Sequence, residues 1–169
     1  KDDIILEIGP GKGKLTEKLL QLLSRPESGS RQGSGGKVIA VEKDRELFEF
    51  LKTKFAKELE SCSLVLVHDD ILEFKVESYK VKSYKVIANI PYNITGAILR
   101  KFLTATNQPA LMVLMVQHEV AKRIIGRVGN PSTSLRVKES ILSISVKAYG
   151  EPKMIMKVPA RYFSPSPKV

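Results

Sequence analysis

The stretch Ile4-Ile5-Leu6-Glu7-Ile8-Gly9-Pro10-Gly11-Lys12-Gly13 decides the fold. Its apolar, β-branched start is typical of a buried strand, and the glycines that follow are typical of a tight turn. Leu15–Leu23 carries leucines at helical spacing and predicts a helix directly after the turn. Glycine lets the backbone approach a ligand closely, and the helix N-terminus offers free N–H groups to a negative ligand group.

The same alternation of strand and helix continues along the chain. Further strands are predicted at Val38–Val41, Leu64–Val67, Lys85–Ala88, Ala110–Val116 and Ile141–Val146. Further helices are predicted at Glu46–Leu59, with Leu47, Phe50, Leu51 and Phe55 on one face, at Ile98–Leu103 and at Glu119–Ile125. Ser24–Gly36, which is mostly Ser, Gly and Pro, is predicted to be a flexible surface loop. The pattern predicts an α/β fold with a mainly parallel sheet flanked by helices, and ligand-binding residues just after the strands.

The amino-acid composition favours some classes of function and argues against others. The 169 residues include 28 Lys and Arg against 18 Asp and Glu, a net charge of +10, which favours a nucleic-acid partner or simply a basic surface. One cysteine and two histidines argue against an internal disulfide and against a metal centre. Without an apolar run of roughly 18 residues or a signal peptide, we expect a cytoplasmic protein that does not enter a membrane.

The glycine turn does not match the common phosphate-binding motifs. Counted from Gly9, the third glycine of the dinucleotide fingerprint would fall on Lys14, and no Gly-Lys-Ser/Thr of a P-loop follows. A tight turn without a ligand remains the alternative for this segment alone.

Acidic residues follow the second and third predicted strands. Glu42 lies 33 residues after Gly9, or 20 once the 13-residue loop is removed, which is the usual distance for an acid that binds ribose hydroxyls. After the third strand, Asp70 can accept from the exocyclic amine of an adenine, and Ile71 can pack on the ring. Asp69 could instead cap the next turn, and His68 is interpreted as a turn residue.

The segment Asn89-Ile90-Pro91-Tyr92 follows the fourth predicted strand and suits chemistry on an amine. An adenine amine is a poor nucleophile until its nitrogen becomes more tetrahedral. The Asn89 side-chain oxygen and the Ile90 carbonyl can accept its two hydrogens, while Pro91 directs that carbonyl inward. Tyr92 offers a flat face for the extruded base. The alternative is a strand end followed by a proline turn.

These motifs resemble known methyltransferases. Glu-x-Gly-x-Gly-x-Gly resembles the first motif of the class I S-adenosylmethionine-dependent methyltransferases, which have a Rossmann-like fold. Asn-Ile-Pro-Tyr with Asn93-Ile94-Thr95 resembles the ribosomal-RNA adenine dimethyltransferase family, and so do Met115–Arg123 and Val158–Val169. The resemblance implies S-adenosylmethionine as cofactor. It implies cofactor-binding roles for Glu7, Gly9, Gly11, Gly13, Glu42, Lys43, Asp70, Ile71 and Asn89, and catalytic roles for Asn89, Ile90, Pro91, Tyr92 and Phe163.

The resemblance covers nearly the whole chain, so we expect one catalytic domain over residues 1–169, flanked in the complete protein by an N-terminal segment and a C-terminal helical domain. The family's Tyr-Gly before the sixth strand is replaced by Glu139-Ser140. The resemblance implies a monomer that dimethylates adenine N6 in small-subunit ribosomal RNA during ribosome biogenesis.

The expected RNA contacts are Arg100, Lys101, Arg123, Arg127 and Arg161. Three alternative functions remain: a large-subunit RNA methyltransferase of the macrolide-resistance branch, a non-catalytic ribosome-assembly factor, and a nicotinamide oxidoreductase. The glycine spacing argues against the oxidoreductase.

Overall fold

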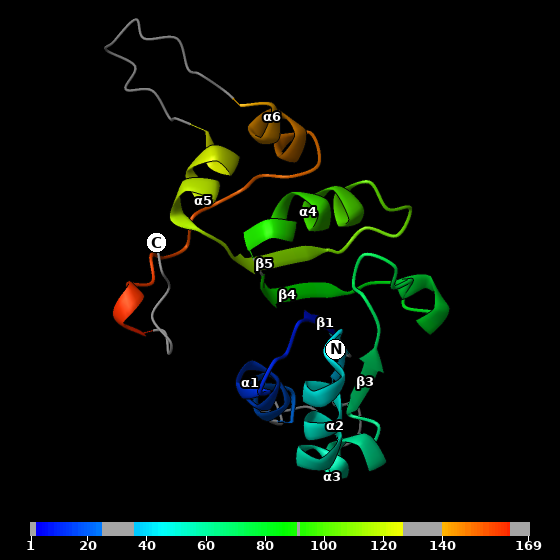
Figure 1. Ribbon diagram of the computed structural model, residues 1–169. Coiled ribbons are helices and arrows are strands. Elements are labelled where there is room, and N and C mark those ends of the chain that lie inside the picture. Colours follow the sequence, from blue (N-terminus) through cyan, green and yellow to red (C-terminus); the bar gives the residue numbers. More distant parts are fainter. Residues whose placement is uncertain (1–2, 25–35, 91, 127–139, 163–169) are drawn as a thin grey trace, which may run out of the picture. The chain divides into compact units, whose positions relative to one another are not determined.

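The computed structural model describes residues 3–24, 36–90, 92–126 and 140–162 (Figure 1). Residues up to Met115 form one compact unit, and those from Val116 onward form a second. The loop predicted at Ser24–Gly36 lies outside the described residues except for its two ends.

A five-stranded parallel sheet organises the first unit. Its strands are β1 (Ile4–Ile8), β2 (Lys37–Glu42), β3 (Leu64–His68), β4 (Lys85–Asn89) and β5 (Leu111–Met115). They lie in the order β3-β2-β1-β4-β5, so the chain reverses its direction of travel across the sheet between β1 and β4. The prediction of a parallel α/β fold is confirmed, with strand ends within one residue or so of those expected.

Helices cover both faces of this sheet (Figure 1). On one face lie α1 (Lys14–Leu23), α2 (Arg45–Lys54) and α3 (Ala56–Glu60), and their core includes Leu19, Leu51 and Phe55. On the other face α4 (Thr95–Leu103) buries Ile98 and Phe102 against the sheet. Two short 3-10 turns, η1 (Val76–Tyr79) and η2 (Tyr92–Ile94), precede β4 and α4.

The single helix predicted at Glu46–Leu59 is wrong, because Phe55 divides it into α2 and α3. Phe55 has φ −111° and ψ 31°, outside the helical region, and its N–H ends α2 by donating to the Leu51 carbonyl. This break lets the Phe55 ring lie buried next to the backbone of Gly13 at the start of α1. Phe50, expected on the buried face, is half exposed, as is Leu22 of α1.

The second unit contains α5 (His118–Ile125), α6 (Ile141–Lys147) and the 3-10 turn η3 (Ala160–Tyr162). The strand predicted at Ile141–Val146 is therefore wrong. The Ser140 hydroxyl accepts the Ser143 N–H at 3.1 Å and caps a helix, and it donates to the Arg123 carbonyl at 2.9 Å. Ser143 and Val146, three residues apart, are the buried positions, whereas Ile141 is exposed. The burial follows helical periodicity despite the alternation of apolar residues and serines.

Candidate active site at the carboxyl edge of the sheet

The predicted site residues gather at the carboxyl ends of neighbouring strands in the first unit. Ile8 of β1 is in register with Val41 of β2 and with Ala88 of β4, so the glycine turn lies between the ends of these two strands. Glu42 is paired with His68, which ends β3. In open α/β sheets a ligand binds where the chain reverses its direction across the sheet, here between β1 and β4.

The glycines of the turn differ in what surrounds them. Gly9 and Gly11 have φ of 64° and 58°, and a Cβ at either position would meet nothing within 4 Å. Gly13 has φ 73°, but its Cβ would lie 2.5 Å from the Phe55 ring and 2.8 Å from Leu51. Gly9 and Gly11 thus leave space for a ligand, whereas Gly13 lets α1 pack closely on Phe55.

The carboxylate of Glu42 holds the glycine turn in place. Its Oε2 accepts the Gly11 N–H at 3.0 Å, and its Oε1 accepts the Asp44 N–H at 2.9 Å. Glu42 is only 6% exposed, and a carboxylate has about four acceptor sites, so both oxygens can accept further bonds from ribose hydroxyls.

Glu7 lies behind the turn, on the sheet face that α1 covers. It is 1% exposed, and neither carboxyl oxygen has a hydrogen-bond partner among the described residues. Burial raises its pKa from 4.5 to about 7. The nearby Thr16 partly offsets this rise in pKa, although no hydrogen bond to either Glu7 oxygen is formed among the described residues. The negative charge of Glu42 adds to the rise. The Thr16 hydroxyl is likewise buried and has no hydrogen-bond partner in the part of the chain that the structure describes. Glu7 is therefore beneath the turn and not on its ligand-facing surface.

The turn after β3 is built around Asp70. Its Oδ1 accepts the Leu72 N–H at 2.9 Å, and its Oδ2 forms an ion pair with the Lys43 ammonium at 2.8 Å. The Lys43 partner holds the pKa of Asp70 below its usual range. Asp69 accepts the Asp70 N–H and so caps this turn locally. Ile71 is 5% exposed, and its side chain packs within the core.

Asn89 ends β4 opposite Met115, and its side chain is exposed. Within the described ranges its carboxamide makes no hydrogen bond. Ile90 buries its side chain, and its N–H donates to the Met115 carbonyl at 3.3 Å. Tyr92 begins η2, while Pro91 and Phe163 lie outside the described residues.

The expected RNA-binding residues fall in both units. Arg100 is exposed, whereas the Lys101 ammonium donates to the Leu72 carbonyl at 2.7 Å and supports the turn after β3. Arg123 and Arg161 are exposed in the second unit, and Arg127 is not among the described residues.

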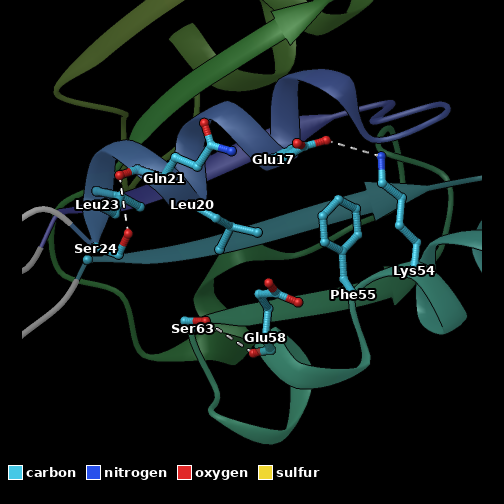
Figure 2. Close-up of a pocket in the computed structure, with 10 residues that line it drawn as sticks. Glu17, Leu20, Gln21, Leu23, Ser24, Lys54, Phe55, Glu58 and Ser63 are labelled. Carbon is cyan, nitrogen blue, oxygen red and sulfur yellow. Dashed lines mark hydrogen bonds and ion pairs between the residues drawn. The ribbon is translucent and has the colours of Figure 1, made fainter.

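A cavity of about 510 Å³ lies away from this edge (Figure 2). Its lining includes Gly36 and Ser63, which immediately precede β2 and β3, so it belongs to the amino end of the sheet. The chemistry-bearing residues are at the opposite edge.

The described residues include no group of three or more His, Cys, Asp or Glu side chains able to hold a metal ion. No helix in the described ranges is long and apolar enough to cross a membrane.

The carboxyl edge fits a nucleoside-bearing cofactor. Two glycines with open space above them can receive an extended ligand, and acceptor-only carboxylates follow β2 and β3 where ribose hydroxyls and a purine amine need them. These are the parts that S-adenosylmethionine presents.

Two supporting residues, Thr16 and Lys54, were missed from the sequence, and Lys101 was expected to contact RNA instead of supporting the turn after β3. Lys54 donates to the Lys12 carbonyl at 3.1 Å and forms an ion pair with Glu17 at 3.5 Å, which fixes the turn from α2. These contacts join residues 9 to 42 positions apart, and no local motif indicates them.

Similarity to known proteins agrees with this geometry. Residues 1–169 match the family described as ribosomal RNA adenine dimethylase. The chain belongs to that family. It is 39% identical over 169 residues to ribosomal RNA small subunit methyltransferase A of Dehalococcoides mccartyi strain CBDB1, covering 99% of this chain and 50% of the relative. The corresponding protein of Nostoc punctiforme is 38% identical over 180 residues, covering 100% of this chain and 56% of the relative.

Solved structures give the same class of fold. A dimethyladenosine transferase from Plasmodium falciparum superposes with a TM-score of 0.72 at 28% identity, covering 98% of this chain and 52% of that one. The 23S rRNA methyltransferase ErmE superposes with a TM-score of 0.74 at 26% identity, covering 99% and 58%. The fold is therefore that of the S-adenosylmethionine-dependent methyltransferases. The chain spans about half the length of the curated relatives described above.

Proposed function

We propose that the protein transfers methyl groups from S-adenosylmethionine to the 6-amino group of adenine in small-subunit ribosomal RNA, giving dimethyladenine. One observation carries the proposal: Asn89, whose carboxamide makes no hydrogen bond to the residues that the structure describes, ends β4 beside the glycine turn that follows β1. The proposed amine-polarising group and the proposed cofactor-binding turn thus lie at the ends of two neighbouring strands. Family membership and the names of the relatives support the RNA target.

The cofactor would be held by groups of three turns. Gly9 and Gly11 allow its methionine end to lie against the backbone, Glu42 accepts from the ribose, and Asp70 accepts from the purine amine. S-adenosylmethionine supplies an electrophilic methyl group carried on a sulfonium sulfur.

The chain's own chemical task is to prepare the target amine. The Asn89 oxygen and the Ile90 carbonyl accept the two amine hydrogens, which moves the nitrogen lone pair out of the ring plane and towards the methyl group. Tyr92 is proposed to stack on the extruded base. The methylated amine becomes acidic and loses its proton to water, so no strong base is required.

The expected partner is the small ribosomal subunit or its precursor. The net charge of +10 favours RNA, since Lys and Arg side chains that contact phosphates release condensed counterions. A cytoplasmic location and a monomeric state stay predictions from the sequence.

Large-subunit RNA is the second candidate substrate, because the similarity to ErmE extends over almost the whole chain. The test is methyl transfer with radiolabelled cofactor onto purified small and large subunits in separate reactions, followed by mapping of the modified base. Dimethyladenine in small-subunit RNA alone is the expected result. Modification of large-subunit RNA alone would identify the second candidate. RNA binding without methyl transfer to either subunit would identify an assembly factor.

A further inference from the structure

The ion pair between Lys43 and Asp70 joins the turn after β2 to the turn after β3. The Lys43 ammonium lies 2.8 Å from Asp70 Oδ2, and the two side chains are 76% and 30% exposed. The other carboxyl oxygen, Oδ1, is already used by the Leu72 N–H. Because both oxygens of Asp70 are already engaged, the purine amine of the cofactor has to compete with the Lys43 ammonium for this carboxylate.

The backbone of Lys43 is held independently of this ion pair. The His68 ring contacts the Lys43 carbonyl through Nε2 at 3.2 Å and packs against Phe48 at a centroid distance of 5.0 Å. The Asp69 N–H donates to the Glu42 carbonyl at 3.1 Å. These contacts keep the two turns together even when the ammonium moves, and the highly exposed Lys43 side chain has room to move.

We propose that Lys43 is a movable counter-ion that occupies the purine-binding oxygen of Asp70 until the cofactor's adenine amine displaces it. The inference rests on the proposed function, since it assumes that Asp70 receives the purine. While the cofactor is absent, Lys43 pairs with the carboxylate and keeps it oriented. When the purine arrives, the ammonium returns to water. The contact opposes binding weakly, because an exposed ion pair contributes little to stability.

Lys43→Met tests this inference, because methionine keeps an unbranched apolar stem and removes the charge. We expect the variant to bind S-adenosylmethionine roughly two- to fivefold more tightly than the wild type at low salt, as measured by calorimetry. At about 1 M salt, where the Debye length falls to about 3 Å, the difference should largely disappear. Lys43→Gln should change affinity in the same direction.

Lys85→Met is the matched control. The Lys85 ammonium also lies 2.8 Å from a carboxylate, Asp3 Oδ2, with exposures of 38% and 43%. Lys85 begins β4, so this pair lies at the amino end of the sheet, away from the site. Its loss should leave cofactor affinity unchanged.

Asp70→Asn separates failure of this inference from failure of the proposed function. Asp70→Asn should weaken cofactor binding, and adding Lys43→Met to it should then give no gain. If Asp70→Asn left affinity unchanged, the purine assignment itself would fail. If Asp70→Asn weakened binding but Lys43→Met weakened it too or had no effect, the counter-ion role would be overturned.

A carboxyl ¹³C titration of Asp70 gives a readout that does not depend on affinity. In the wild type its pKa should lie below the ordinary value, and in Lys43→Met it should rise towards that value. An unchanged Asp70 pKa in the variant would contradict the ion pair on which the proposal stands.

Discussion

The cofactor half and the chemical half of the carboxyl edge are built differently. In the cofactor half, which comprises the turns after β1, β2 and β3, the two carboxylates proposed to bind the cofactor are already engaged: Glu42 with Gly11 and Asp44, and Asp70 with Leu72 and Lys43. In the chemical half, the Asn89 carboxamide has no partner within the described residues. Groups that hold a cofactor can be oriented in advance by the protein, whereas a group that polarises an incoming amine must keep its acceptor free.

The largest effect is expected where this difference bears on the chemical step. Asn89→Ala removes an acceptor aimed at a nitrogen that becomes cationic in the transition state. Losing a comparable preorganised partner lowers the rate on the order of a hundredfold to a thousandfold. Single-turnover methyl transfer with saturating cofactor and RNA measures this rate. A rate close to that of the wild type would remove Asn89 from the catalytic centre.

Within the cofactor half, two glycines should respond differently to alanine. Gly13→Ala should lower the free energy of unfolding by about 2–4 kcal/mol, because the left-handed backbone is strained and the Cβ meets Phe55 and Leu51. Gly11→Ala should lower it by only about 1–2 kcal/mol, from backbone strain alone, and should weaken cofactor binding. Urea unfolding of both variants makes the comparison, and equal losses would show that Gly13 has no special packing role.

The stability of the protein should depend on pH through Glu7, because its buried carboxyl lacks, among the described residues, the hydrogen bonds that Glu42 has. A pKa raised from 4.5 to about 7 means that protonated Glu7 stabilises the fold below pH 4.5, and that this contribution is lost as the pH rises through 7. Glu7→Gln does not titrate. Its free energy of unfolding relative to the wild type should therefore rise by about 2–3 kcal/mol between pH 4.5 and pH 8. A constant difference across this range would contradict the raised pKa.

The smallest effect concerns the base-stacking residue proposed for the chemical half. Tyr92→Ala should weaken productive RNA binding by roughly 1–3 kcal/mol, the value of stacking on one base. Tyr92→Phe keeps the flat face and should retain most of the activity. The dependence of the single-turnover rate on RNA concentration separates the two variants. Equal losses in both would assign the role to the hydroxyl instead of the ring.

Much of the fold could be predicted because its strands are continuous apolar runs that end in distinctive turns. The succession of strands β1 to β5 along the chain follows from this pattern, and so does the position of Glu42, Asp70 and Asn89 at or just beyond the strand ends. The prediction of a strand at Ile141–Val146 is wrong, because serines alternate with apolar residues there although the segment is helical. The N-cap at Ser140 was the local signal of a helix.

The remaining features depend on contacts between distant residues. Glu7 follows the expected motif, but only the packing of α1 and Thr16 over it removes its carboxyl from water. Likewise, Lys43 and Asp70 are 27 residues apart in sequence, and they can form an ion pair because β2 and β3 are neighbours in the sheet. The local sequence does not predict which carboxylate a lysine side chain pairs with.

The most direct test of the account measures cofactor affinity and single-turnover rate side by side for Glu42→Ala and Asn89→Ala. Glu42→Ala should weaken S-adenosylmethionine binding by about 1.5–3 kcal/mol, the value of hydrogen bonds to a charged group, and leave the rate at saturating cofactor much less affected. Asn89→Ala should show the reverse, with the rate reduced a hundredfold or more and the affinity changed far less. If both variants lost affinity and rate in the same proportion, the division into a cofactor half and a chemical half would be wrong.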